Sequence, residues 1–138
     1  MRLFLRIALA VFFIAAGVNH FRVPEMYLGI MPPMLPWPRE LVWISGVAEI
    51  AGGIGVLIPA LRRAAAWGLI ALLVAVFPAN IYAALHGMVI NGHDVPAWTL
   101  WARLPLQFVF IGWVAAACLP RKTIQGVPGT YRKRSSPE

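Results

Sequence analysis

The stretch "AAAWGLIALLVAVFPANIYAAL", residues 64–85, carries no charged side chain over its whole length. An α-helix rises about 1.5 Å per residue, so about 20 residues are needed to cross the roughly 30 Å hydrocarbon core of a bilayer. This run is long enough and apolar enough to do so. It predicts a transmembrane helix, and therefore a protein that folds in lipid.

The composition of the whole chain also favours a membrane protein. Of the 138 residues, 60% are hydrophobic and only 12% are charged, and the mean hydropathy is +0.74. Soluble domains are closer to half apolar and about one quarter charged. The formal charge of +7 would suit a nucleic-acid-binding protein. However, the basic residues flank long apolar stretches, which is typical of membrane topology and argues against nucleic acid as a partner.

Three further apolar stretches extend this prediction to a bundle. We predict an all-α fold, an integral membrane bundle of four transmembrane helices over residues 1–119. The helices are expected at residues 3–21, 41–59, 64–85 and 104–119, with loops at 22–40 and 86–103 on one side of the membrane. Residues 120–138 are predicted to form a basic, disordered cytoplasmic tail.

The arginine and lysine residues in the flanks predict the orientation. Arg22, Arg39 and Arg103 lie on the side of the two long loops, whereas the other nine basic residues lie on the side of the two termini. The positive-inside rule therefore places both termini in the cytoplasm. One alternative is that residues 1–17 form a cleavable signal peptide, which would leave three crossings. The intact mass of the purified protein distinguishes the two.

Glu49 is the residue that most needs an explanation, because it lies in the middle of the predicted helix 41–59. An ionised side chain at the centre of a membrane helix costs about 2.5–3.5 kcal/mol on insertion scales, so this carboxylate must be neutral, paired or hydrated. Arg103 and Gln107 share one face of the fourth helix at spacing i, i+4. We expect Arg103 to pair with Glu49, supported by Asn80 and His20.

The strongly polar side chains of the four helices all fall in the half of the bundle near the long loops, and the opposite half is almost wholly apolar. This one-sided distribution predicts a single polar pocket. The predicted ligand-binding residues are Glu49, Arg103, Gln107, Asn80, His20, Asn19 and Ser45.

Each of these residues also has a purely structural interpretation. Glu49 and Arg103 would then only fix the helix register, Asn80 would be an interhelical hydrogen-bond donor, and His20 would be an imidazole at the membrane interface. His86 and His93 lie in a loop without metal-ligand spacing, so no metal site is predicted.

The chain contains a single cysteine, Cys118, which excludes an internal disulfide or a CxxC pair. We interpret it as a small buried hydrophobe.

Four segments together resemble the DoxX-like family of small bacterial membrane proteins. They are "AAGVNHFRVPEMY" (15–27), "PRELVWISGVAEIAGGIGVLIP" (38–59), "RRAAAWGLIALLVAVFPANIY" (62–82) and "RLPLQFVFIGWV" (103–114). The resemblance implies a four-helix bundle in the bacterial plasma (inner) membrane. Its namesakes are small subunits of a membrane thiosulfate:quinone oxidoreductase. Distantly similar proteins that form disulfides use cysteine pairs, which this chain lacks.

These observations leave several functions open. The first hypothesis is a binding protein whose pocket holds a small amphipathic molecule such as a quinone. The alternatives are a membrane subunit of a quinone-linked oxidoreductase, a small-molecule transporter and a non-catalytic assembly factor. The sequence has no haem, flavin or iron–sulfur ligand set, so no catalytic residue and no cofactor beyond a bound quinone is predicted. The expected partners are the bilayer, an amphipathic ligand, and either a second copy of the chain or a redox complex.

Overall fold

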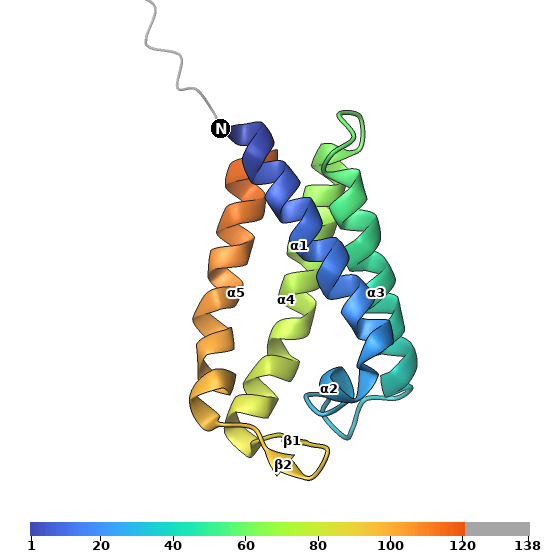
Figure 1. Ribbon diagram of the computed structural model, residues 1–138, viewed down its shortest axis with the longest axis vertical. Helices are drawn as coiled ribbons and strands as arrows, with labels where there is room; N and C mark the ends of the chain where they lie inside the picture. The colour runs from blue at the N-terminus through green and yellow to red at the C-terminus, as the bar shows by residue number, and fades with distance from the viewer. Residues whose placement is uncertain (121–138) are drawn as a thin grey trace, which may run out of the picture.

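The computed structural model describes residues 1–120, and the predicted tail from residue 121 onward lies outside the described residues. The described chain is all-α apart from one very short hairpin (Figure 1). The elements in chain order are α1 (Arg2–Arg22), α2 (Pro24–Leu28), α3 (Pro38–Gly55), α4 (Arg62–His86), β1 (Val89–Ile90), β2 (His93–Asp94) and α5 (Ala97–Cys118).

Within the described residues, α1, α4 and α5 are long and apolar enough to cross a membrane. Three such helices indicate a multi-pass membrane protein. The sequence also predicted a membrane helix at 41–59, but the corresponding helix α3 is not among those long and apolar enough to cross. It has 18 residues and includes Arg39, Glu40 and Glu49, so its apolar run is shorter than that of the other three.

The four long helices are arranged as two pairs. Helix α1 packs against α3, and α4 packs against α5. A tight turn after α3 makes α3 and α4 antiparallel neighbours and joins the pairs. The amino terminus, this turn and the end of α5 lie at one end of the bundle, here called the amino-terminal end (Figure 1). Helix α2 and the two strands lie at the opposite end, here called the hairpin end.

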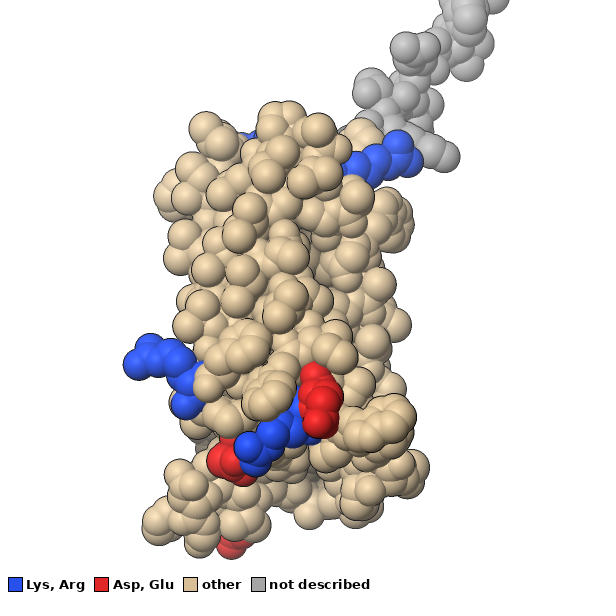
Figure 2. All heavy atoms as spheres, turned by 90° about the vertical axis from the view of Figure 1, so that its right-hand side faces the viewer, with Lys and Arg blue, Asp and Glu red and all other residues tan. Residues whose placement is uncertain are grey.

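Charged side chains are absent from most of the visible surface in Figure 2. On this face they gather at the edge of the amino-terminal end and in the part nearer the hairpin end, and the wide area between shows none. An uncharged belt between two charged ends is the surface expected of a protein embedded in a bilayer.

The main hydrophobic core lies toward the amino-terminal end, where all four long helices meet. Its buried residues are Leu9, Ala10, Phe13, Val56, Ala66, Leu69, Leu73, Val114, Ala117 and Cys118. Small residues allow this packing, as they commonly do in membrane helices. A Cβ atom on Gly17 would lie 2.6 Å from the carbonyl oxygen of Gly46, and one on Gly52 would collide with the side chain of Leu69. Helix α3 therefore approaches α1 on one side and α4 on the other through glycines.

The predicted boundaries of two helices were wrong. Helix α3 runs from Pro38 to Gly55, so it begins and ends earlier than the predicted 41–59. Helix α5 begins at Ala97, although the sequence predicted a loop until residue 103. The prediction treated Arg103 and Pro105 as the start of the helix. The structure instead keeps Pro105 inside it, which membrane helices tolerate when neighbouring groups satisfy the freed backbone.

The hairpin in the predicted loop 86–103 was also missed. Asn91 and Gly92 form its turn with φ angles of 51° and 79°, and Val89 pairs with Asp94 across it. An Asn-Gly turn with two positive φ angles matches the twist of a two-residue hairpin. The sequence therefore contained the signal for this element.

Candidate functional site

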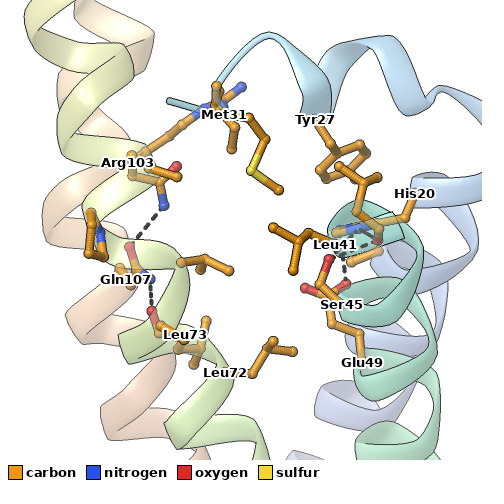
Figure 3. Close-up of a pocket in the computed structure, with 18 of the residues that line it drawn as sticks. His20, Tyr27, Met31, Leu41, Ser45, Glu49, Leu72, Leu73, Arg103 and Gln107 are labelled. Carbon is orange, nitrogen blue, oxygen red and sulfur yellow. Dashed lines mark hydrogen bonds and ion pairs between the residues drawn. The ribbon is translucent and has the colours of Figure 1, made fainter. Parts of the chain in front are cut away.

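A cavity of about 810 Å³ lies between the two helix pairs, in the half of the bundle nearer the hairpin end (Figure 3). The pairs meet in the core at the amino-terminal end and separate beyond it. Apolar side chains form the floor of the cavity toward the core, among them Phe12, Phe13, Leu72, Leu73 and Phe110. Residues of α2 and the segment after it line its outer part, including Met26, Ile30, Met31, Met34 and Leu35.

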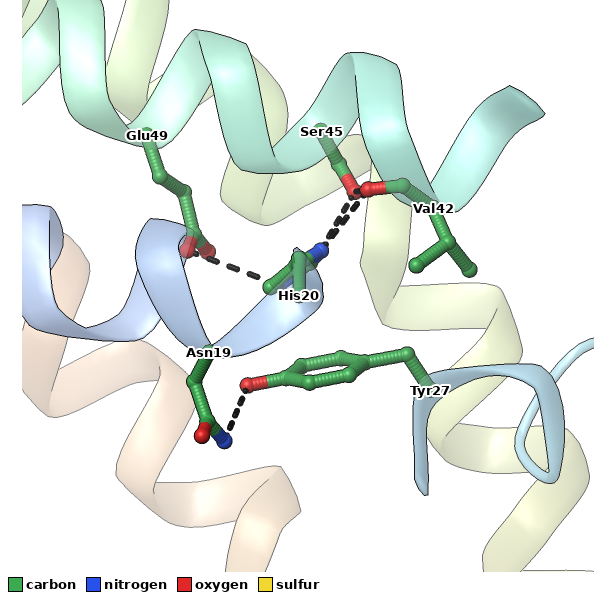
Figure 4. A network of polar contacts seen from close by, with 6 residues as sticks. All are labelled: Asn19, His20, Tyr27, Val42, Ser45 and Glu49. Atoms are coloured by element: carbon green, nitrogen blue, oxygen red, sulfur yellow. Dashed lines mark hydrogen bonds and ion pairs between the residues drawn. The ribbon is translucent and has the colours of Figure 1, made fainter. Parts of the chain in front are cut away.

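One wall of the cavity, here called the acidic wall, is built by α1 and α3 and centred on Glu49 (Figure 4). Oε2 of Glu49 lies 3.5 Å from Nε2 of His20. The other ring nitrogen of His20, Nδ1, lies 2.9 Å from the carbonyl oxygen of Val42 and 3.0 Å from Oγ of Ser45. The Ser45 hydroxyl itself donates to the Val42 carbonyl at 2.8 Å. His20 and Ser45 are both buried.

These contacts assign the tautomer of His20. A carbonyl oxygen can only accept a hydrogen bond, so Nδ1 of His20 must carry the hydrogen that faces Val42. In a neutral ring, Nε2 is then an acceptor, and it faces the carboxyl group of Glu49. A lone pair and an ionised carboxylate would repel each other there, so one proton must reside on Glu49 or on Nε2 of His20. The pair is therefore electrically neutral as a unit.

The carboxyl group of Glu49 is nevertheless not fully satisfied. Its Oε2 is buried and has no hydrogen-bond partner among the described residues. The 3.5 Å separation from His20 is an ion-pair distance, but it is longer than a normal N–H···O hydrogen bond of about 2.7–3.2 Å. Buried polar atoms in native proteins are almost always hydrogen-bonded, so this oxygen is an exception, and because it is buried beside His20 it is closed off from the cavity.

Tyr27 of α2 covers the acidic wall. Its ring lies against that of His20, with centroids 3.7 Å apart, and its hydroxyl accepts a hydrogen bond from Nδ2 of Asn19 at 3.2 Å. Burial raises the pKa of the Tyr27 phenol, while the hydrogen bond from Asn19 opposes the rise. The phenol therefore stays protonated at neutral pH and retains its own hydrogen as a donor.

The opposite wall, here called the amide wall, is built by α4 and α5. Nδ2 of Asn80 donates to Oε1 of Gln107 at 2.9 Å, and Nε2 of Gln107 donates to the carbonyl oxygen of Leu73. Gln107 is only 4% exposed, so both ends of this amide are satisfied inside the protein. Arg103, one turn before Gln107, also lines the cavity.

The predicted ion pair between Glu49 and Arg103 is not formed; the partner of Glu49 is His20. The physical reason is the pairing of the helices. Helix α3 packs against α1, whereas α5 packs against α4, so Glu49 and Arg103 end up on facing walls of the cavity (Figure 3). Among the described residues, the guanidinium group of Arg103 makes no ion pair and no side-chain hydrogen bond.

The structure brings most of the predicted pocket residues to this one cavity. Those that line it are Glu49, Arg103, Gln107, Asn80, His20 and Ser45. Asn19 is not among the lining residues and acts through Tyr27. Tyr27 also lines the cavity, although it was not among the predicted ligand-binding residues. Pro24 indicated this position. Proline favours the first turn of a helix, so a short helix is expected directly after α1, and Tyr27 then lies over the end of α1.

The described part of the chain holds no group of three or more histidine, cysteine, aspartate or glutamate residues that could bind a metal ion.

Residues 9–118 match a family described as "Domain of unknown function (DUF8561)". The chain belongs to this family. The DUF8561 match runs from the first turns of α1 to the end of α5, so the whole cavity lies within the family's domain. No curated protein and no solved structure matches the chain. The DoxX-like resemblance thus stays a prediction, and the DUF8561 family is what the match supports.

Proposed function

We propose that this DUF8561 protein binds a small amphipathic molecule, such as a quinone, in the cavity between its two helix pairs. The observation that carries the proposal is the facing arrangement of the two polar walls across one apolar-floored cavity. Small-molecule sites are commonly concave and mostly apolar, with a few convergent polar groups that fix orientation. At about 810 Å³, the cavity is within the usual size range of roughly 300–1,000 Å³.

The polar groups have free hydrogen-bonding capacity that a ligand would use. On the acidic wall, the carboxyl group of Glu49 is partly exposed and makes no hydrogen bond with a described residue, and the Tyr27 hydroxyl keeps a donor. On the amide wall, Arg103 has unused N–H groups. A head group with polar atoms at two ends would contact both walls, while its apolar part would pack on Phe12, Phe13 and the leucines of α4.

The experiment is a thermal-stability titration in a neutral detergent with a decyl-substituted quinone. A ligand that binds only the folded state at 100 times its Kd stabilises it by about 2.7 kcal/mol, so the midpoint of unfolding should rise by several degrees. Decylbenzene, which has the chain and a ring but no polar atoms, should give a much smaller rise. No shift at saturating quinone would count against the proposal.

A matched pair of variants locates the effect. Leu72 points into the cavity (Figure 3), and Val74 of the same helix is 58% exposed on its outer surface. Leu72→Trp should fill the cavity and abolish the quinone-induced shift, whereas Val74→Trp should retain it. Equal responses in the two variants would place the quinone elsewhere, for example in the detergent belt.

We also propose that α3 crosses the bilayer with α1, α4 and α5, and that both termini are in the cytoplasm of a bacterium. The antiparallel packing of α3 on α1 and the uncharged belt on the visible face (Figure 2) support four crossings. Arg2, Arg6, Arg62 and Arg63 at the amino-terminal end support the orientation. A reporter enzyme that is active only outside the cytoplasm should be inactive when fused after α5 and active when inserted at Gly92.

A second candidate function is that of a proton-transferring membrane subunit in an oxidoreductase. The 3.5 Å approach of Glu49 and His20 favours it, because a carboxyl group and an imidazole that share one proton can pass it to a bound molecule. Purification of the native complex would test this idea. A redox partner should copurify, and Glu49→Gln should lower its turnover while Glu40→Gln, on the exposed start of α3, should not.

A further inference from the structure

The charges that line the cavity do not cancel. Four lining side chains can ionise, namely His20, Tyr27, Glu49 and Arg103. Tyr27 is a neutral phenol, and Glu49 with His20 forms a neutral unit because the geometry requires one proton between them. That sum is the same whether the proton is on the carboxyl group or on the ring. The cavity therefore carries one net positive charge, which belongs to Arg103.

Among the described residues, no carboxylate lies within ion-pair distance of the Arg103 guanidinium group. The other ion pair at the hairpin end joins Arg39 to Glu25 at 3.5 Å on the surface, and neither residue lines the cavity. Glu49, the acidic side chain in the cavity lining, is already neutralised by its partner His20. The guanidinium group of an arginine can bind an oxyanion, such as a carboxylate or a phosphate, through two parallel hydrogen bonds, and a carboxylate matches the single positive charge of this cavity.

We propose that the head group recognised by the cavity is a monoanion, the carboxylate of a single-chain amphiphile, held by Arg103 with its chain on the apolar floor. This inference rests on the proposed function and narrows the class of ligand. The second N–H of the Asn80 side-chain amide is not used by Gln107 and lies on the same wall as Arg103. These groups favour an acceptor-rich anion over a cation or an uncharged ester.

The experiment compares decanoate, methyl decanoate and decyltrimethylammonium as ligands of the purified full-length protein at pH 8 in a neutral detergent. Apparent dissociation constants come from the shift of the unfolding midpoint with ligand concentration. Decanoate should bind at least tenfold more tightly than the methyl ester, and the cation should bind more weakly than either. Equal affinities for decanoate and its ester would overturn the inference while leaving an amphiphile-binding cavity in place.

Variants of arginine locate the anion site. Arg103→Gln should weaken decanoate binding at least tenfold, to the level of the ester, and Arg103→Lys, which keeps the charge, should weaken it less. Arg39→Gln removes the same charge at the same end of the bundle outside the cavity, and should leave the affinity within about threefold of the wild type. A similar loss in Arg39→Gln would show a general charge effect and contradict the inference.

Glu49→Gln tests the charge sum directly. If Glu49 and His20 form a neutral unit, the cavity charge is unchanged, so the ratio of decanoate affinity to methyl decanoate affinity should stay within about threefold of the wild-type ratio, even where both affinities change. If Glu49 were ionised beside a neutral His20, the substitution would remove a negative charge and raise that ratio tenfold or more, which would overturn the inference. Should neither decanoate, its ester nor the decyl quinone stabilise the wild type, the proposed function itself would fail.

Discussion

The two halves of this bundle use the same four helices in opposite ways. Toward the amino-terminal end the helix pairs meet in a close-packed apolar core, whereas toward the hairpin end they separate around a cavity with two polar walls. Within each pair the helices stay together over both halves, so the separation is between pairs. The core half can thus supply most of the stability, which leaves the cavity half free to expose unsatisfied polar groups to a ligand.

The largest expected effect on stability concerns the contact between α1 and α3. Gly17→Ala would place a Cβ atom 2.6 Å from the backbone oxygen of Gly46, so α1 and α3 would have to move apart. We expect a loss of about 3 kcal/mol in the free energy of unfolding, at the upper end of overpacking costs. Chemical unfolding in mixed micelles measures it.

Gly68→Ala is the control for this substitution, because a Cβ at Gly68 has no heavy atom within 4 Å. The same exchange there should be neutral or stabilise by about 0.5–1 kcal/mol through helix propensity. Equal effects at the two glycines would mean that the close approach of α1 and α3 contributes little.

A smaller difference in stability should distinguish the core half from the cavity half within helix α4. Leu69 is 1% exposed in the core, and Leu72 of the same helix borders the cavity. In lipid, moving a leucine side chain out of the core changes the free energy little, because the lipid is itself apolar. The destabilisation caused by Leu→Ala therefore comes mainly from lost packing contacts. We expect Leu69→Ala to cost about 2 kcal/mol. Leu72→Ala only enlarges an existing space and should cost less than about half of that.

Unfolding of both leucine variants under identical detergent conditions gives the comparison. Equal losses would indicate that the cavity half is as closely packed as the core half in the membrane, and the division between halves would then be wrong.

The smallest effect concerns Tyr27 at the hairpin end and depends on pH. Burial holds the pKa of this phenol above its usual value of 10. A raised pKa in the folded state contributes stability that is fully present below pH 10 and is lost as the pH rises through the folded-state pKa. Between pH 8 and pH 10.5 the wild-type unfolding midpoint should therefore fall more than that of Tyr27→Phe.

Tyr82→Phe is the matched control, since the Tyr82 ring stacks on His86 away from the cavity. Its midpoint should fall with pH as the wild type does. A Tyr27→Phe variant with the wild-type pH profile would show that this phenol is in contact with water and does not cover the acidic wall.

Most of the helices could be predicted from sequence because each depends on a local property. Long uncharged runs gave α1 and α4, and the polar residues that border the cavity were found because a polar group in an apolar helix is conspicuous. The start of α5 was missed since Arg103 and Pro105 look locally like a helix boundary. The hairpin was missed although Asn91 and Gly92 signalled it.

The sequence by itself determined that the protein is helical, that it belongs in lipid, and that Glu49 needs a partner, because charge and hydropathy are properties of the chain. Which partner it takes was decided only by the tertiary structure. Arg103 and His20 are both polar residues within reach in a four-helix bundle, and no local pattern distinguishes them. The glycines of α3 settle the choice, since they bring α1 and its histidine into contact with Glu49 and leave Arg103 across the cavity on α5.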